Sequence, residues 1–231
     1  MTSPPQTAAP RRQRRRSASS LLVRTGGHVG ALVPGLLLAW DAATGGLSVD
    51  PVKELTQRTG KDAFVLLVLS LAVGPIVRIT GLRTVAPLAR ILGLYAFGYA
   101  TLHLLAFVGL DFGFRGDLIV DGVLEKRFAL IGLTAFLILL VLTATSTRAR
   151  VRRLGPIWKR IHRLAYLAGA FATLHYLWAV KTITREQLAW AGVVGVLLAL
   201  RLPEAAGLFV LTRRKLTRER PPRDGPPTAE S

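Results

Sequence analysis

Four histidines, His28, His103, His162 and His175, are the side chains best suited to bind a metal ion in this 231-residue sequence. The sequence has no cysteine, and its single methionine is Met1. These absences exclude iron–sulfur clusters, thiolate-bound haem and the covalent attachment of c-type haem. Imidazole suits iron, so the residue types favour a b-type haem bound by histidine.

His103 and His175 form the leading pair because each lies within a long apolar segment, at a similar expected depth. Two imidazoles that face each other fill both axial positions of a haem iron, which leaves no position open for oxygen and indicates electron transfer. Two alternatives stay open here. Each histidine could simply hydrogen-bond a neighbouring helix. A zinc site is the other metal, but it usually takes three or four ligands, and no carboxylate is expected at this depth.

His162 stands 13 residues before His175, or about 20 Å along a helix axis, which suits two cofactors stacked through a membrane. The same spacing turns the two side chains about 140° apart, so a bend or frayed turn is needed to aim both at one helix. Ala89 and Arg90, not a histidine, stand at the inner depth of the facing segment. His162 is therefore either a cofactor ligand or an ordinary interfacial residue, and His28 is predicted to be interfacial.

Tyr95, Tyr99 and His103 are spaced four residues apart, so we expect them to form one stripe along a helix. Such a stripe either lines a cofactor or packs against a neighbouring helix. The segment around His175 is rich in alanine and glycine. Small residues allow close helix packing, and they would also leave room for a flat macrocycle.

The apolar residues that surround these histidines fall in blocks, and a bilayer-spanning helix needs about 20 such residues. Hydrophobic residues make up 51% of the sequence. The alternation expected of membrane strands is absent, so we predict an all-α, polytopic membrane protein with a bundle of six transmembrane helices. No internal repeat with shared residues is apparent. The predicted segments cover residues 27–47, 62–79, 91–110, 128–145, 161–180 and 187–210.

The two ends of the chain are polar and basic. Residues 1–26 contain the run RRQRRR at 11–16 and are predicted to be a disordered cytoplasmic tail. Residues 27–210 form the predicted transmembrane domain, and residues 211–231 a second disordered tail.

The basic residues are divided unevenly between the two sides of the predicted bundle. The formal net charge is +18, which taken alone would suggest nucleic-acid binding. However, 23 Lys and Arg residues fall on one side of the bundle and eight on the other. The positive-inside rule therefore places both the N and the C terminus in the cytoplasm.

Four stretches of the sequence resemble one known family. They are DPVKELTQRTG, LARILGLYAFGYATLHLL, LTATSTRARVRRLGPIWKRIHRLAYL and HYLWAVK. These stretches are similar to MsrQ, also called YedZ, the haem-binding membrane subunits of the bacterial periplasmic methionine sulfoxide reductase system. That family belongs to the ferric reductase-like transmembrane superfamily, and the resemblance covers roughly residues 28–202.

The resemblance implies a function and a set of site residues. His103 in TLHLL, His162 in KRIHRL and His175 in LHYLW match positions associated with haem. The family is described as binding haem b and also FMN, in the inner membrane, and no residue here can be matched to FMN. Its members pass electrons to a periplasmic molybdenum-cofactor enzyme that repairs oxidised envelope proteins. Methionine oxidation is reversible, so such a repair path is reasonable.

The electron donor must be separate, because no G-x-G-x-x-G strand–helix unit for a nicotinamide cofactor is present. We expect electrons from the quinone pool or from a flavin reductase.

Two rival functions are a stand-alone ferric or metal reductase, which needs a chelate site on the outer face, and a non-redox anchor or transporter. A transporter predicts helices broken by Gly and Pro in both halves, but only Pro34 and Pro75 lie well within apolar blocks.

Overall fold

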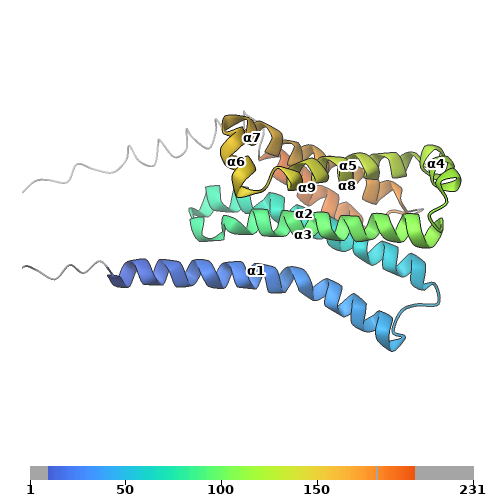
Figure 1. Ribbon diagram of the computed structural model, residues 1–231, viewed down its shortest axis with the longest axis horizontal. Coiled ribbons are helices and arrows are strands. Elements are labelled where there is room, and N and C mark those ends of the chain that lie inside the picture. The colour runs from blue at the N-terminus through green and yellow to red at the C-terminus, as the bar shows by residue number, and fades with distance from the viewer. Residues whose placement is uncertain (1–9, 181, 201–231) are drawn as a thin grey trace, which may run out of the picture.

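The computed structural model describes residues 10–180 and 182–200, and every regular element in this part of the chain is helical. Six helices match the predicted apolar segments and lie roughly alongside one another (Figure 1). The predicted all-α class is therefore confirmed. The six are α1 (Pro10–Thr44), α2 (Pro51–Thr80), α3 (Pro87–Ala106), α5 (Arg127–Ala144), α8 (Leu164–Trp178) and α9 (Arg185–Ala199).

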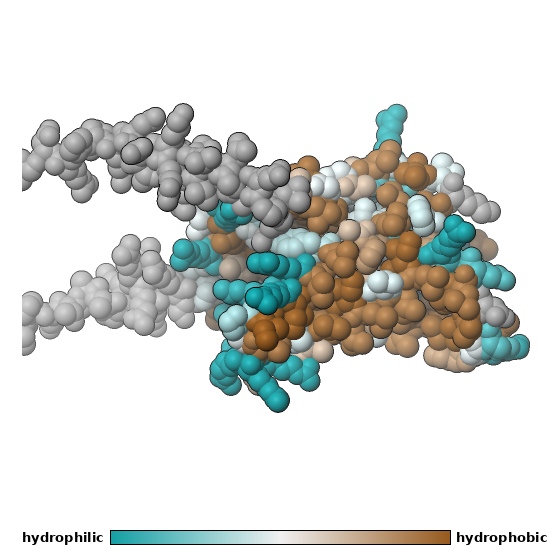
Figure 2. Space-filling model, turned by 90° about the horizontal axis from the view of Figure 1, so that it is seen from above, coloured by the Kyte–Doolittle hydropathy of each residue, from teal (hydrophilic) through white to brown (hydrophobic). Residues whose placement is uncertain are grey.

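The surface of the helices is that of a membrane protein. Within the described residues, four stretches are long and apolar enough to cross a bilayer: Ser19–Thr44, Pro51–Thr80, Arg83–Asp111 and Arg127–Ala144. α8 and α9 have 15 residues each, fewer than the roughly 20 residues of a typical spanning helix. A bundle of six spans is compatible with the structure. Figure 2 shows a broad apolar surface with hydrophilic side chains gathered towards its two ends. An apolar surface of this extent indicates contact with lipid.

Short helices occupy the connections between the long ones. A 3₁₀ turn (Arg83–Val85) precedes α3, and a π-helical turn (Phe107–Asp111) follows it. α4 (Gly116–Glu125) lies at one end of the molecule, whereas α6 (Arg148–Leu154) and α7 (Pro156–His162) lie at the other (Figure 1). His162 was predicted to begin the fifth apolar helix, but it ends the separate helix α7. A single turn residue, Arg163, divides α7 from α8, and its backbone angles remain in the right-handed helical region.

Two helices begin earlier than predicted. α2 starts at Pro51 instead of residue 62, because the side chain of Asp50 accepts a hydrogen bond from the Lys53 N–H and proline suits the first helical position. Asp62 therefore lies well inside α2 and not at its start. α1 starts at Pro10 and takes in most of the predicted tail, since residues 11–24 contain good helix formers and neither Gly nor Pro. Residues 1–9 and 201–231, which include the end of the predicted segment 187–210, lie outside the described residues.

α2 is the central helix of the bundle, in contact with α1, α3, α8 and α9. Its buried residues include Phe64, Leu67, Val68 and Leu71, and Val68 is only 2% exposed. Lipid tails are as apolar as these side chains. Close packing, and not the exclusion of water, therefore holds such helices together.

The helix pair α2–α3 is repeated as α5–α8, and the prediction that no repeat exists was wrong. A shift of 72 residues converts His103 into His175 and Gly60 into Gly132. Both pairs of helices pack against each other. The repeat was hidden because most of its shared residues are the alanines and leucines that any membrane helix contains. Further identical pairs at this shift are Phe64 and Phe136, Ala96 and Ala168, and Thr101 and Thr173.

Candidate functional site

The structure brings His103 of α3 and His175 of α8 together. The centroids of the two imidazole rings lie 5.9 Å apart, and the ring planes are inclined by 75°. Each histidine stands in the last turn of its helix. Both rings are partly buried in the bundle. The two residues expected to share a depth are therefore neighbours in space.

One nitrogen of each ring is already engaged by the backbone of a neighbouring helix. Nδ1 of His103 lies 2.8 Å from the carbonyl oxygen of Thr56 in α2, and Nδ1 of His175 lies 2.8 Å from that of Phe128 in α5. A carbonyl oxygen can only accept, so Nδ1 must carry the hydrogen in both rings. The lone pair is then on Nε2, which is the tautomer that a metal-binding histidine needs.

An aromatic side chain flanks the pair. The ring of Phe128 lies 5.9 Å from that of His175, at 43°. Within residues 10–180 and 182–200, no group of three or more His, Cys, Asp or Glu residues could hold a metal ion. A zinc site with three protein ligands therefore finds no support here, whereas a haem iron takes only two ligands from the protein.

His162 is not part of this pair. Its ring stacks on that of Trp158, with centroids 4.1 Å apart, and its Nε2 lies 3.2 Å from the hydroxyl oxygen of Thr145. The Thr145 hydroxyl donates to the carbonyl of Val141, so it accepts from His162. The residue that corresponds to His162 in the first half of the repeat is Arg90, 72 positions earlier.

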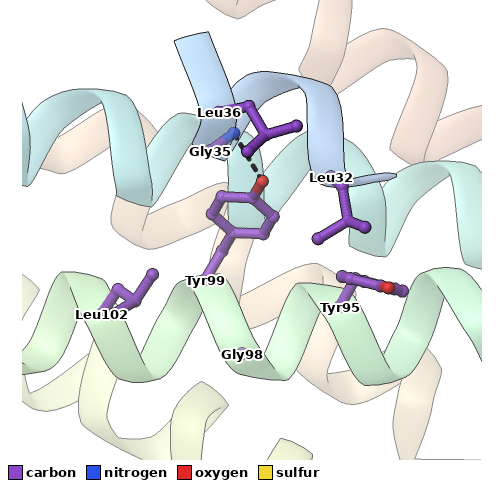
Figure 3. A pocket seen from close by; sticks show the side chains of 7 residues that line it. All are labelled: Leu32, Gly35, Leu36, Tyr95, Gly98, Tyr99 and Leu102. Atoms are coloured by element: carbon purple, nitrogen blue, oxygen red, sulfur yellow. Dashed lines mark hydrogen bonds between the residues drawn. The ribbon is translucent and has the colours of Figure 1, made fainter. Parts of the chain in front are cut away.

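The tyrosine stripe of α3 packs against α1. The hydroxyl of Tyr99 donates to the carbonyl of Ala31 (2.9 Å) and accepts from the N–H of Gly35 (2.7 Å), as Figure 3 shows in part. A regular helix would pair these two backbone groups with each other. The hydroxyl bridges them beside Pro34, and α1 bends along its length (Figure 1). The packing alternative is therefore the one that the structure supports for Tyr95 and Tyr99, whereas His103 contacts α2.

Next to Tyr99 lies a shallow apolar groove between α1 and α3, lined by leucines of both helices (Figure 3). Tyr95 borders it, and its hydroxyl lies 3.2 Å from Nδ1 of His28. His28, predicted to be interfacial, is exposed at this point and does not approach the other histidines.

Two basic side chains in the first part of α2, Arg58 and Lys61, are paired with carboxylates. Arg58 contacts Asp41 at 2.6 Å and Glu54 at 3.3 Å. Lys61 contacts Glu186 at 2.7 Å, and its hydrogen bond and charge hold the pKa of that carboxyl below its usual value. Carboxylates occupied in this way are poor candidates for a metal-chelate site on this face.

Two glycines near the histidines were missed by the sequence analysis. Gly60 of α2 faces the ring of His103, and Gly132 of α5 faces the ring of His175. The sequence could have identified them, because glycine recurs from position 60 to 132 at the same 72-residue shift that relates His103 to His175.

The sequence of the helix bundle matches a known family of membrane proteins. Residues 59–173 match the family described as the ferric reductase like transmembrane component. The match begins in α2, includes His103 and His162, and ends two residues before His175. No solved structure matches the chain.

Two curated relatives extend the likeness to almost the whole chain. One, from Xanthomonas axonopodis pv. citri, is named protein-methionine-sulfoxide reductase heme-binding subunit MsrQ. It is 38% identical over 207 residues, which cover 87% of this chain and 95% of the relative. A protein of the same name from Xanthomonas oryzae pv. oryzae is 37% identical over 216 residues, covering 91% and 98%.

Proposed function

Because the chain belongs to the MsrQ family of heme-binding subunits of protein-methionine-sulfoxide reductase, we propose that it conducts electrons across the bacterial inner membrane through a b-type haem. In this proposal His103 and His175 are the two axial ligands. The acceptor is a periplasmic methionine sulfoxide reductase with a molybdenum cofactor, and the purpose is repair of oxidised envelope proteins.

The observation that carries the proposal is the geometry of the two rings. A metal–imidazole bond is about 2 Å long, so one iron between two Nε2 atoms places the ring centroids roughly 6 Å apart. The distance of 5.9 Å between His103 and His175 fits that arrangement. Both rings also present the required tautomer, since Nδ1 of each faces a carbonyl oxygen.

The protein's own residues hold and orient the site. The carbonyls of Thr56 and Phe128 fix the rotation of the two rings, and the last turns of α3 and α8 fix their positions. When bound, haem iron supplies a centre that gains and loses one electron without moving atoms. Two protein ligands leave no vacant position on the iron, which suits transfer of electrons and not binding of oxygen.

The distribution of basic residues indicates the side of the membrane from which electrons enter. With both termini in the cytoplasm, α3 and α8 run outward and His103 and His175 lie nearer the periplasm. Electrons then enter from the quinone pool or from a cytoplasmic flavin reductase. FMN is implied only by the family resemblance, and the proposal does not need it.

His162 serves an inner cofactor site in this proposal, as a ligand or as the point where electrons enter. Support comes from its position 13 residues before His175, at the end of α7 that precedes α8, and from its basic neighbours Arg160 and Arg163. Guanidinium groups favour an anionic partner such as a haem propionate or a flavin phosphate. To act as a ligand, His162 must bind the metal in one of two ways. Either its Nε2 releases the Thr145 hydroxyl and binds the metal, or its Nδ1 binds the metal.

The test is spectroscopic and then functional. The protein purified with its haem should give the absorption spectrum of low-spin b-type haem. In vesicles, the chemically reduced haem should be reoxidised when the periplasmic reductase and methionine sulfoxide are both added. Reoxidation by a ferric chelate alone, with none by the reductase, would instead establish the stand-alone ferric reductase. Protein that binds no haem would support the anchor or transporter, although the unbroken helices α2 and α5 argue against the latter.

A further inference from the structure

Gly60 and Gly132 stand in the interior of α2 and α5, where glycine is a poor helix former. Each costs about 1 kcal/mol relative to alanine in such a position. Some glycines in the helices lie in open space, for example Gly98 and Gly195, at which an added Cβ would meet nothing within 4 Å, and others, such as Gly169, face an apolar side chain. Gly60 and Gly132 are different, because each faces an imidazole ring.

A side chain at either position would collide with the ring. A Cβ on Gly60 would lie 2.8 Å from Nδ1 and 2.9 Å from Cε1 of His103. A Cβ on Gly132 would lie 2.6 Å from Nδ1 and 2.7 Å from Cε1 of His175. Both rings are restrained by a 2.8 Å hydrogen bond, so neither can turn aside as the end of a flexible side chain can.

The position of each glycine explains how the ring reaches the backbone. Thr56 and Phe128, whose carbonyls accept from the rings, stand four residues before Gly60 and Gly132 respectively. In an α-helix the Cα–Cβ bond tilts towards the N-terminus, so the side chain of residue i+4 covers the flank of carbonyl i. A glycine leaves that flank open to a donor from outside the helix.

We propose that Gly60 and Gly132 are positioning residues for haem ligation. Each opens one helix carbonyl to the Nδ1–H of a ligand histidine, and thereby sets the rotation of the ring and the electron density on Nε2. This inference rests on the proposed function, in which His103 and His175 bind haem. Because a hydrogen bond at Nδ1 makes the ligand more basic and favours ferric iron, the glycines help to keep the reduction potential low.

The experiment compares Gly60→Ala, Gly132→Ala and the matched control Gly98→Ala in the haem-loaded protein. The control is a glycine on α3 itself, five residues from His103. We expect the first two variants to shift the reduction potential of the haem to more positive values and to alter the low-spin electron paramagnetic resonance signal. Gly98→Ala should leave both at the wild-type values, since it adds a methyl group without touching either ring.

Wild-type potential and resonance signal in both Gly60→Ala and Gly132→Ala would overturn the inference. His103→Ala and His175→Ala, measured in parallel, separate this failure from a failure of the proposed function. If the histidine variants lose the low-spin signal while the glycine variants are normal, the ligands stand and the glycines are packing residues only. If the histidine variants are also normal, the ligand assignment itself is wrong, and the inference falls with it.

If Gly60→Ala folds poorly, a double variant tests whether the ring of His103 is the cause. Circular dichroism of Gly60→Ala/His103→Ala, which has no ring for the new methyl group to meet, should then show recovered helix. Recovery identifies the ring as the neighbour that requires glycine. A double variant that is as poorly folded as Gly60→Ala would show that glycine is needed for another reason, and would overturn the inference.

Discussion

The imidazole plane of His103 stands at 75° to that of His175, with 5.9 Å between the ring centroids. The two rings come from corresponding positions of a repeated helix pair, and each is anchored through Nδ1 on the helix that precedes it in that pair. The same backbone contact therefore orients both rings of the proposed ligand pair.

Replacing either histidine of the pair should destroy the low-spin site. We expect His103→Ala and His175→Ala each to abolish the low-spin b-type absorption spectrum, or to convert it to high spin, because one axial ligand is lost. His28→Ala is the control, since His28 contacts Tyr95 and not the pair. Wild-type spectra from both variants would contradict the ligand assignment.

Replacing His162 should separate the inner site from the outer one. His162→Ala is expected to keep the low-spin spectrum of the haem at His103 and His175, because its ring contacts Trp158 and Thr145 instead. Reduction of that haem by quinol or flavin reductase should slow, whereas reduction by dithionite should not. Full cofactor content together with normal reduction by the physiological donor would make His162 an ordinary interfacial residue.

Removing the hydroxyl of Tyr99 should loosen α1. Tyr99→Phe leaves the carbonyl of Ala31 and the N–H of Gly35 without their bridging partner, at a cost of about 1–3 kcal/mol for a buried group. Thermal unfolding should show the loss, with the haem spectrum unchanged. Tyr95→Phe, which removes only an exposed contact with His28, should cost less; an equal or larger loss there would refute this account of Tyr99.

The orientation can be tested with single cysteines, since the natural sequence has none. Arg115→Cys, between α3 and α4, should be labelled by an impermeant thiol reagent from outside the cell. Arg150→Cys in α6 should be labelled only after the membrane is opened. Labelling of residue 150 in intact cells would reverse the topology and, with it, the assignment of the haem to the periplasmic half.

The sequence by itself determined the class of the protein and the identity of the pair. Blocks of apolar residues predicted the membrane helices, because a bilayer core requires the backbone to pair within each segment. The absence of cysteine, with two histidines at similar depth in such blocks, pointed to His103 and His175. Those conclusions need only composition and the position of each residue along a helix.

The tertiary structure decided what depends on contacts between helices. That Nδ1 of His103 meets the carbonyl of Thr56, and that Gly60 leaves room for the ring, follows from the packing of α2 on α3, which no local pattern records. The turn at Arg163 likewise places His162 at the end of a separate helix, with its ring stacked on that of Trp158. Depth is a one-dimensional property that the chain encodes directly, whereas the direction in which a side chain points is fixed only when neighbouring helices have packed.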